Sequence, residues 1–331
     1  MSTGVQTAPV QSGPTEFQLA IAYSVCRSIA RANAKNFYYA FLVLPKRKRE
    51  ALCAVYAFMR RCDDISDESA LSIHERRLKL ADWLDSFHRV MQGKPTDDPV
   101  MLALADAQRR FKIPIDLLDQ LALGTAMDLT VPGSEDDEPE FARGQFQPSA
   151  RPGESVPSSS TNIRYQTFED LYQYCYKVAS VVGLACIRIF GYRDPMAEPL
   201  AERCGLAFQL TNIIRDVKED AAMGRIYVPQ EDFAKFGLNP SELSGSPDPA
   251  RFGPLLAMEA DRAREFYRAG EELLPFISED SQPALWVLVT IYRQLLEKIA
   301  ARQYDVFTSR VSLTVWEKLK VLGKGFVKRL A

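Results

Sequence analysis

The sequence predicts an all-helical protein, and two observations support this prediction. Apolar residues recur at three- and four-residue spacings through most of the chain, which is the period of one helix face. No segment shows the alternating, β-branched pattern of strands bounded by Asn-Gly or Asp-Gly turns. We therefore expect about ten main helices, at 17–35, 46–61, 74–91, 99–111, 114–129, 168–190, 195–222, 252–276, 283–307 and 313–330.

The first helices show clear apolar stripes and clear end signals. The first three stripes are Leu19, Tyr23, Cys26 and Ala30; Leu52, Val55, Tyr56 and Met59; and Leu78, Ala81, Leu84 and Phe87. Pro45, Pro99 and Pro114 stand where helices begin, because the first helical turn does not use the amide hydrogen that proline lacks. Gly93 is the end signal of the third helix.

One polar segment interrupts the helical pattern. Residues 132–162 are rich in Pro, Gly, Ser and acidic residues, and such a composition buries too little apolar surface to become ordered. We expect a mobile polar insertion here, in preference to a domain boundary, because the helices on either side look incomplete without each other. The expected organisation is a flexible tail over 1–15 and a single domain over 16–331.

Composition excludes several classes of function. The 41 Lys and Arg nearly balance the 43 Asp and Glu, so no overall field favours nucleic acid. Two histidines, His74 and His88, are too few for a three-His zinc site, and neither lies in a recognisable catalytic motif. The six scattered cysteines are expected to be reduced, which fits a cytoplasmic protein, and no secretory signal or membrane-spanning segment is expected.

The first acidic motif follows an apolar stretch and contains Asp63, Asp64 and Asp67. If the helix continues through it, Asp63 and Asp67 lie four residues apart on one face, with about 6 Å of rise between them. Such a pair becomes costly in a recessed site unless a cation binds there. Taken alone, the motif also fits an acidic helix end that fades into a solvated loop.

The second motif lies inside a long apolar helix. Asn212, Asp216 and Asp220 recur every four residues and form one polar stripe. Buried carboxylates are costly without partners. Two acid pairs on two helices are what a carboxylate-lined Mg²⁺ site requires, since Mg²⁺ takes a few carboxylates, several waters and substrate phosphate oxygens. Together the two motifs favour a functional interpretation over a solvated surface.

Basic residues accompany the acids. Arg60 precedes the first motif, Arg215 lies within the second and Arg225 follows it, while Lys35 stands at the end of the first expected helix. Mg²⁺ together with Arg and Lys neutralises a departing diphosphate or triphosphate. Each basic residue alone would be a surface charge; beside the acids, Arg60 and Arg225 are better candidates than Lys35. No P-loop is present.

A third motif is apolar. Tyr174 lies one turn before a face of small residues that includes Val178, Ala179, Val182 and Gly183. Such a face allows close approach either of another helix or of a ligand. Core packing and a ligand cavity both remain open on these residues alone.

Together these motifs resemble the squalene/phytoene synthase family of head-to-head prenyl synthases. The stretches NFYYAFLVLP, YAFMRRCDDISDE, YCYKVASVVGL, QLTNIIRDVKEDAAMGRIYVP and QYDVF occur in that order between about Ala34 and Phe307. The resemblance is interrupted by the polar segment at 132–162, which is longer than the family leads us to expect. It implies a single isoprenoid-synthase helical bundle with a central apolar cavity.

The resemblance also implies roles for individual residues. The metal ligands would be Asp63, Asp67, Asn212, Asp216 and Asp220, with Asp64 as an auxiliary acid. The diphosphate-binding residues would be Lys35, Tyr56, Arg60 and Arg225. The cavity lining would be Phe37, Tyr174, Val178, Ala179, Val182, Gly183, Phe208 and Gln209. Tyr174 or the released diphosphate would accept the proton that is lost when the cyclopropane ring of the intermediate closes.

The implied activity is that of a Mg²⁺-dependent prenyltransferase that joins two prenyl diphosphates through a cyclopropylcarbinyl diphosphate. The main interpretation is two farnesyl diphosphates giving presqualene diphosphate or squalene, with NADPH as cofactor for squalene. One alternative is two geranylgeranyl diphosphates giving phytoene. A non-catalytic relative that acts as an assembly factor or binds lipid is disfavoured, because both acid pairs are complete. Head-to-tail elongation and cyclisation are disfavoured, because elongating synthases usually carry DDxxD-type motifs. The second motif here reads DVKED, with NxxxD before it.

The last expected helix, at 313–330, is basic and amphipathic. Packing on the bundle is one interpretation. The other is a weak, reversible contact with anionic lipid at the inner face of the membrane, which suits an enzyme with an oily product.

Overall fold

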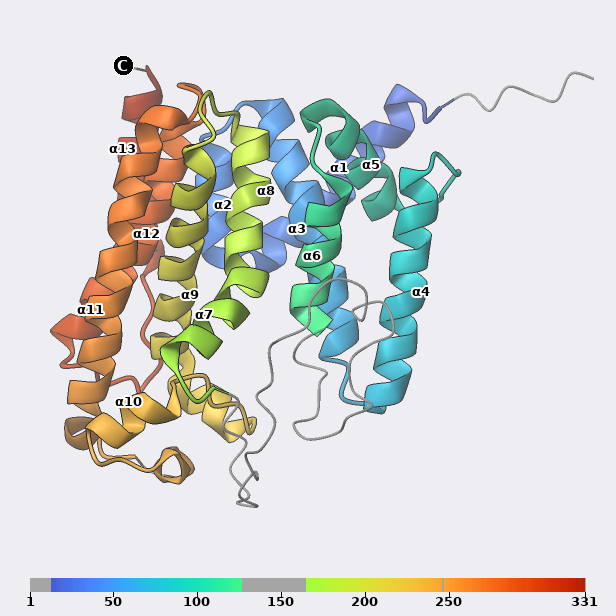
Figure 1. Ribbon diagram of the computed structural model, residues 1–331. Helices are drawn as coiled ribbons and strands as arrows, with labels where there is room; N and C mark the ends of the chain where they lie inside the picture. The colour runs from blue at the N-terminus through green and yellow to red at the C-terminus, as the bar shows by residue number, and fades with distance from the viewer. Residues whose placement is uncertain (1–12, 127–164, 246, 331) are drawn as a thin grey trace, which may run out of the picture.

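The computed structural model describes residues 13–126, 165–245 and 247–330, and these form a helical bundle (Figure 1). The α-helices are α1 (Glu16–Asn33), α2 (Lys35–Leu42), α3 (Lys46–Ser66), α4 (Ile73–Met91), α5 (Pro99–Phe111), α6 (Ile115–Ala126), α7 (Phe168–Cys175), α8 (Val181–Phe190), α9 (Ala197–Ala222), α10 (Gln230–Lys235), α11 (Pro249–Leu273), α12 (Gln282–Ala301) and α13 (Val315–Leu330). Within the described ranges no strand forms, so the all-α prediction is confirmed. The expected insertion at 132–162 and most of the expected tail lie outside them.

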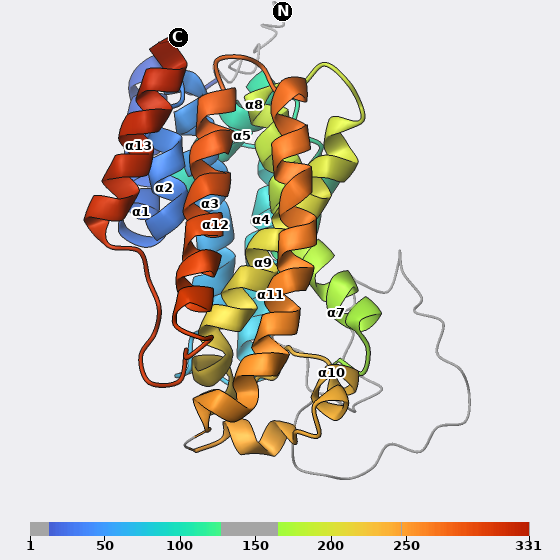
Figure 2. The ribbon, with the colours of Figure 1, turned by 90° about the vertical axis from the view of Figure 1, so that its left-hand side faces the viewer.

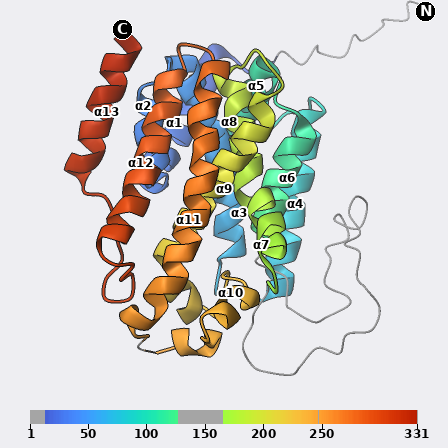
Figure 3. The ribbon, with the colours of Figure 1, turned by 60° about the vertical axis from the view of Figure 1, so that its left-hand side comes forward.

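Two long helices organise the bundle. The first, α3, packs against α1, α4, α5 and α6, whereas α9 packs against α8, α11 and α12. Figures 2 and 3 show α11, α12 and α13 side by side, with α13 outermost. Both α3 and α9 end at the lower side of Figure 1. The ends of the two motif-bearing helices therefore lie at the same end of the molecule.

Local sequence explains most helix boundaries. The bounds of α5 match the prediction, because the carboxylate of Asp98 accepts the amides of Val100 and Met101, Pro99 fills the first position, and Lys112 leaves the helix at φ 51°. At the end of α12 the chain takes the left-handed conformation at Gln303, with φ 54°. This stops the helix at Ala301, earlier than predicted.

The segment predicted as one helix over 168–190 is interrupted. A π-helical turn, Tyr176–Ser180, separates α7 from α8. Two glycines allow neighbouring helices to approach its backbone. A Cβ on Gly124 of α6 would lie 2.5 Å from the carbonyl oxygen of Lys177, and one on Gly205 of α9 would lie 2.7 Å from that of Ala179. Packing against two helices thus fixes a turn that the 3.6-residue period does not predict.

The short helices α2 and α10 were not predicted as separate elements, because each contains too few residues for a period to be visible. None of the described helices combines the length and the apolarity that a membrane crossing needs.

Candidate functional site

An apolar cavity with a volume of about 180 Å³ lies between α3 and α9. Its walls come from α2, α3, the π-helical turn, α8, α9, α11 and α12. The lining residues are Phe37, Phe41, Leu52, Val55, Tyr56, Met59, Val178, Ala179, Val182, Gly183, Cys186, Ile187, Phe190, Ala201, Cys204, Gly205, Phe208, Gln209, Asn212, Leu273, Leu285 and Leu288.

Most of the residues that the sequence nominated for a cavity are in this lining. They are Phe37, Val178, Ala179, Val182, Gly183, Phe208 and Gln209, together with Tyr56 and Asn212. Gly183 also serves helix packing, because a Cβ there would lie 2.7 Å from the carbonyl oxygen of Ala201. The small-residue face therefore both packs against another helix and lines the cavity, which are the two interpretations that the sequence left open.

Tyr174 is not among these lining residues. Its ring centroid lies 5.4 Å from that of Tyr165 and 5.1 Å from that of Tyr227, so three tyrosines form a buried aromatic cluster. Tyr165 precedes α7 and Tyr227 follows α9, and no spacing within the helical motif shows that these rings would cover Tyr174.

The first acidic motif completes α3. The helix continues to Ser66, so Asp63 is helical and half-buried, and Asp67 is the residue that ends the helix. Asp64 is exposed and forms an ion pair with Arg60, with 2.6 Å between Nη2 and Oδ1. The two alternatives for this motif are therefore both partly met: the acids share a helix face, and that helix ends among them.

The second motif occupies the last turns of α9, where Asn212, Asp216 and Asp220 are half-buried. The Nε atoms of Arg215 and Arg310 donate to Asp216 Oδ1 at 2.7 and 2.9 Å. Burial alone would raise the pKa of Asp216, but the hydrogen bonds and charges of the two guanidinium groups lower it. Asp216 is thus held as a carboxylate.

An ion pair joins the two motifs. Gly224, at φ 74°, turns the chain after α9, and the amide of Arg225 donates to the carbonyl of Asp220 at 2.8 Å. The Arg225 guanidinium then lies 3.7 Å from Oδ1 of Asp67 at the end of α3. Acids that are about 150 positions apart in the sequence therefore face a common region.

A second, polar pocket adjoins the cavity and shares Phe37, Tyr56 and Asn212 with it. Arg215, Arg310 and Lys318 give it a positive lining, with Asn33, Asn36 and Tyr292 beside them. Arg310 and Tyr292 were not predicted, because they belong to no motif and reach the pocket only through the fold. The Lys35 side chain lies outside the described part of the structure.

Among the described residues, no three His, Cys, Asp or Glu side chains lie close enough to hold a metal ion by themselves. The oxygen donors present nevertheless fit Mg²⁺, which binds through one or two carboxylates and completes its shell with water and phosphate oxygens. Asn212 Oδ1 is buried, lines both pockets and has no hydrogen-bond partner. Such an oxygen is available to bind a cation or to accept a hydrogen bond.

Comparison with known proteins agrees with this geometry. The family model described as squalene/phytoene synthase matches residues 30–317. The chain is 32% identical to the 15-cis-phytoene synthase of Synechococcus elongatus over 95% of this chain and 96% of the relative. It is 34% identical to the phytoene synthase of Mycobacterium tuberculosis, over 91% of this chain and 89% of the relative.

Solved structures give the same result. A dehydrosqualene synthase in complex with a ligand superposes with a TM-score of 0.75 at 29% identity, covering 93% of this chain and 96% of the other. A squalene synthase from Alicyclobacillus acidocaldarius superposes with a TM-score of 0.71 at 25% identity, covering 88% and 97%.

Proposed function

The chain belongs to the squalene/phytoene synthase family and is a prenyltransferase, and we propose that its substrates are two geranylgeranyl diphosphates, joined head to head to give phytoene. The observation that carries the C20 assignment is that the relatives at 32% and 34% identity are phytoene synthases. The structures named as dehydrosqualene and squalene synthases are less similar, at 29% and 25%. The expectation of two farnesyl diphosphates thus becomes the alternative.

NADPH has no part in this proposal. Phytoene forms when the rearranged cation loses a proton, whereas squalene formation needs a hydride donor. Nothing in the sequence or the comparisons supports a nicotinamide site.

The acid motifs would hold Mg²⁺ at the cavity mouth through Asp63, Asp67, Asn212, Asp216 and Asp220. Bound Mg²⁺ supplies a Lewis acid that neutralises charge developing on the departing diphosphate. Arg60, Arg225, Lys35 and Tyr56 would contact diphosphate oxygens, and the polar pocket adds Arg215 and Arg310. Arginine suits this task, because its planar guanidinium donates two parallel hydrogen bonds to phosphate.

The cavity would protect the allylic cation from water. Its lining is almost wholly apolar, so a water molecule there would find few partners. Phe208 stacks on Tyr292 with centroids 4.6 Å apart, and the Phe37 ring lies 6.5 Å from Phe208. Aromatic faces stabilise nearby positive charge. These rings line the boundary between the cavity and the polar pocket, where the cation would form.

Incubation of the purified protein with Mg²⁺ and either geranylgeranyl or farnesyl diphosphate tests the assignment. We expect phytoene from the C20 donor without NADPH, and little product from the C15 donor. Presqualene diphosphate as the dominant product would replace the C20 assignment with the C15 alternative. If neither donor is consumed, the non-catalytic alternative takes precedence.

We also propose that α13 contacts anionic lipid. Large apolar side chains cover its outward face: Val315, Trp316, Leu319, Phe326 and Val327, with exposures from 40% to 74%. Lysines 320, 324 and 328 flank them and line a shallow surface pocket with Trp286. An apolar stripe beside a row of lysines matches the interface of an anionic bilayer, which would place the enzyme at the inner face of the membrane.

Sedimentation with phosphatidylglycerol-rich vesicles tests this contact. We expect the protein to bind these vesicles more than phosphatidylcholine vesicles, and Trp316→Ser to weaken binding several-fold. Phe17→Ser is the control, since Phe17 is 75% exposed on α1. Equal loss in both variants, or no binding at all, would contradict the proposal without touching the enzymatic assignment.

A further inference from the structure

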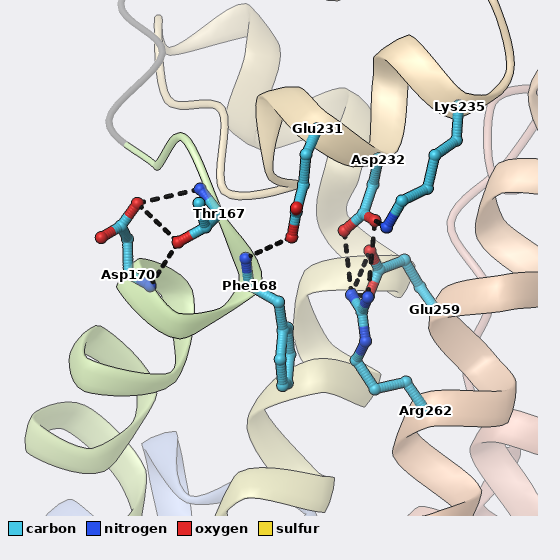
Figure 4. Close-up of polar contacts among 8 residues, drawn as sticks. All are labelled: Thr167, Phe168, Asp170, Glu231, Asp232, Lys235, Glu259 and Arg262. Atoms are coloured by element: carbon cyan, nitrogen blue, oxygen red, sulfur yellow. Dashed lines mark hydrogen bonds and ion pairs between the residues drawn. The ribbon is translucent and has the colours of Figure 1, made fainter.

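Arg262 of α11 contacts residues of α7, α10 and α11 itself (Figure 4). Its Nη1 donates to Asp232 Oδ2 of α10 and to Glu259 Oε1 of α11, both at 2.9 Å. The guanidinium carbon lies 3.9 Å from the ring centroid of Phe168, the first residue of α7. One side chain therefore contacts helices whose sequence positions differ by almost one hundred residues.

The carboxylates of this cluster have no access to water. Asp232 is 0% exposed and Glu259 2% exposed, while Arg262 and Lys235 supply the compensating charges. Burial alone would raise the pKa of Asp232, but hydrogen bonds from Arg262 and Lys235 lower it. Burial raises the pKa of Glu259 to about 7 against the opposing charge of Arg262. Loss of the guanidinium would therefore be costly, because it would leave buried carboxyl groups without this partner.

The same cluster fixes α10 against the chain that enters α7. The amides of Gln230 and Glu231 donate to the carbonyls of Tyr165 and Gln166 at 3.0 and 3.1 Å. In return, the Glu231 carboxylate accepts the amide of Phe168 at 2.8 Å (Figure 4). α10 is thus held on one side by α11 and on the other by the start of α7.

α10 begins only five residues after Arg225. The connection is short and constrained: Tyr227 stacks on Tyr174 within the tyrosine cluster, with centroids 5.1 Å apart. The Arg225 guanidinium in turn forms the ion pair with Asp67 at the end of α3.

We propose that Arg262 is a positioning residue: through Asp232 and α10 it places Arg225 against Asp67, and thereby orients the carboxylate for metal and diphosphate. This inference rests on the proposed function of the acid motifs. A residue that supports a metal ligand from behind has a characteristic effect, since loss of such support weakens metal binding roughly 10–100-fold.

The test compares Arg262→Lys with Arg264→Lys on the same helix. Arg264 also pairs with two carboxylates, those of Asp261 and Glu297, but it contacts neither α7 nor α10. Lysine keeps the charge and loses the planar fork and the stacking. We expect Arg262→Lys to raise the Mg²⁺ concentration for half-maximal activity roughly ten-fold, and to speed hydrogen exchange at 225–235. Arg264→Lys should change neither.

Glu231→Ala is a second variant, in case Arg262→Lys does not fold; it loosens α10 from α7 without leaving a buried charge unpaired. Similar Mg²⁺ requirements in the wild type and in the folded α10 variants would overturn the inference, as would unchanged exchange at 225–235.

Arg225→Gln separates the possible failures. If it leaves activity intact, the proposed function of the mouth fails; if it impairs activity and the α10 variants do not, only the positioning role fails. When Arg225→Gln is combined with Arg262→Lys, the increase in Mg²⁺ requirement should be smaller than the sum of the increases in the two single variants.

Discussion

Two carboxylate–arginine clusters in this molecule are made from similar residues but differ in their exposure to water. In the sealed cluster, Asp232 and Glu259 are closed off from water, and both accept hydrogen bonds from the half-buried Arg262. In the mouth cluster, Asp216 is held by Arg215 and by an Arg310 that is 43% exposed beside a polar pocket. Buried ion pairs hold helices in place, whereas ion pairs that border a pocket can exchange partners with phosphate and metal.

The sharpest contrast concerns stability. Arg262→Met should lower the free energy of unfolding by about 3–5 kcal/mol, because it leaves two buried carboxyl groups without their guanidinium. Denaturant unfolding measures this. A cost below about 1 kcal/mol would show that the sealed cluster is no more than a surface pair.

The mouth should show the reverse pattern. Asp216→Asn or Asp63→Asn should reduce turnover about a hundred-fold or more, with a nearly unchanged melting temperature, because a metal ligand is lost from a partly exposed site. Activity assays and thermal melts on the same preparations check this. Full activity in either variant would remove that residue from the metal site.

Substitution of Arg310 tests the contribution of a positively charged residue to the mouth cluster. Arg310→Gln should raise the KM for the prenyl diphosphate roughly ten-fold through loss of a phosphate contact. It should cost less than about 1 kcal/mol of stability, since the side chain is substantially exposed. A stability loss comparable to that of Arg262→Met would erase the distinction between the clusters.

The smallest expected effect is a pH dependence of stability in the sealed cluster. Glu259 titrates near 7 in the folded protein, against a usual value of 4.5, in contact with Asp232 and Arg262 and close to Cys175. The folded state therefore holds this proton more tightly than the unfolded state. Its stabilisation is complete below about pH 4.5 and is lost as the pH rises through about 7.

Glu259→Gln removes that titration and keeps a neutral group of similar shape. Melting temperatures between pH 5 and 8 should fall less steeply in the variant than in the wild type, by the equivalent of about 1–2 kcal/mol. Parallel curves would show that Glu259 does not change protonation in this range.

Local signals predicted much of the fold. Pro99 marked the start of α5, and the helical period located the main helices, because side-chain direction along a helix follows from position alone. The interruption at Tyr176–Ser180 was not predictable in this way, since it depends on Gly124 and Gly205 from two other helices.

The residues of the candidate site likewise fall into those that local spacing predicted and those that only folding brings together. The spacing of Asp63 and Asp67, and of Asn212, Asp216 and Asp220, nominated the acids, and the small face after Tyr174 nominated much of the cavity wall. Arg310 and Tyr292 were missed, as was the covering of Tyr174 by Tyr165 and Tyr227. Each of these depends on chain segments that meet only after folding.

The amino-acid order by itself therefore determined the helices, the faces they present and the chemistry those faces carry, since all three depend on neighbours within a few turns. Tertiary structure decided which arginine meets which acid, and whether water reaches the pair. Ion-pair strength depends on desolvation, and desolvation is set by atoms contributed from distant parts of the chain. Asp216 and Asp232 look alike in the sequence, and only packing makes one a candidate ligand and the other an anchor.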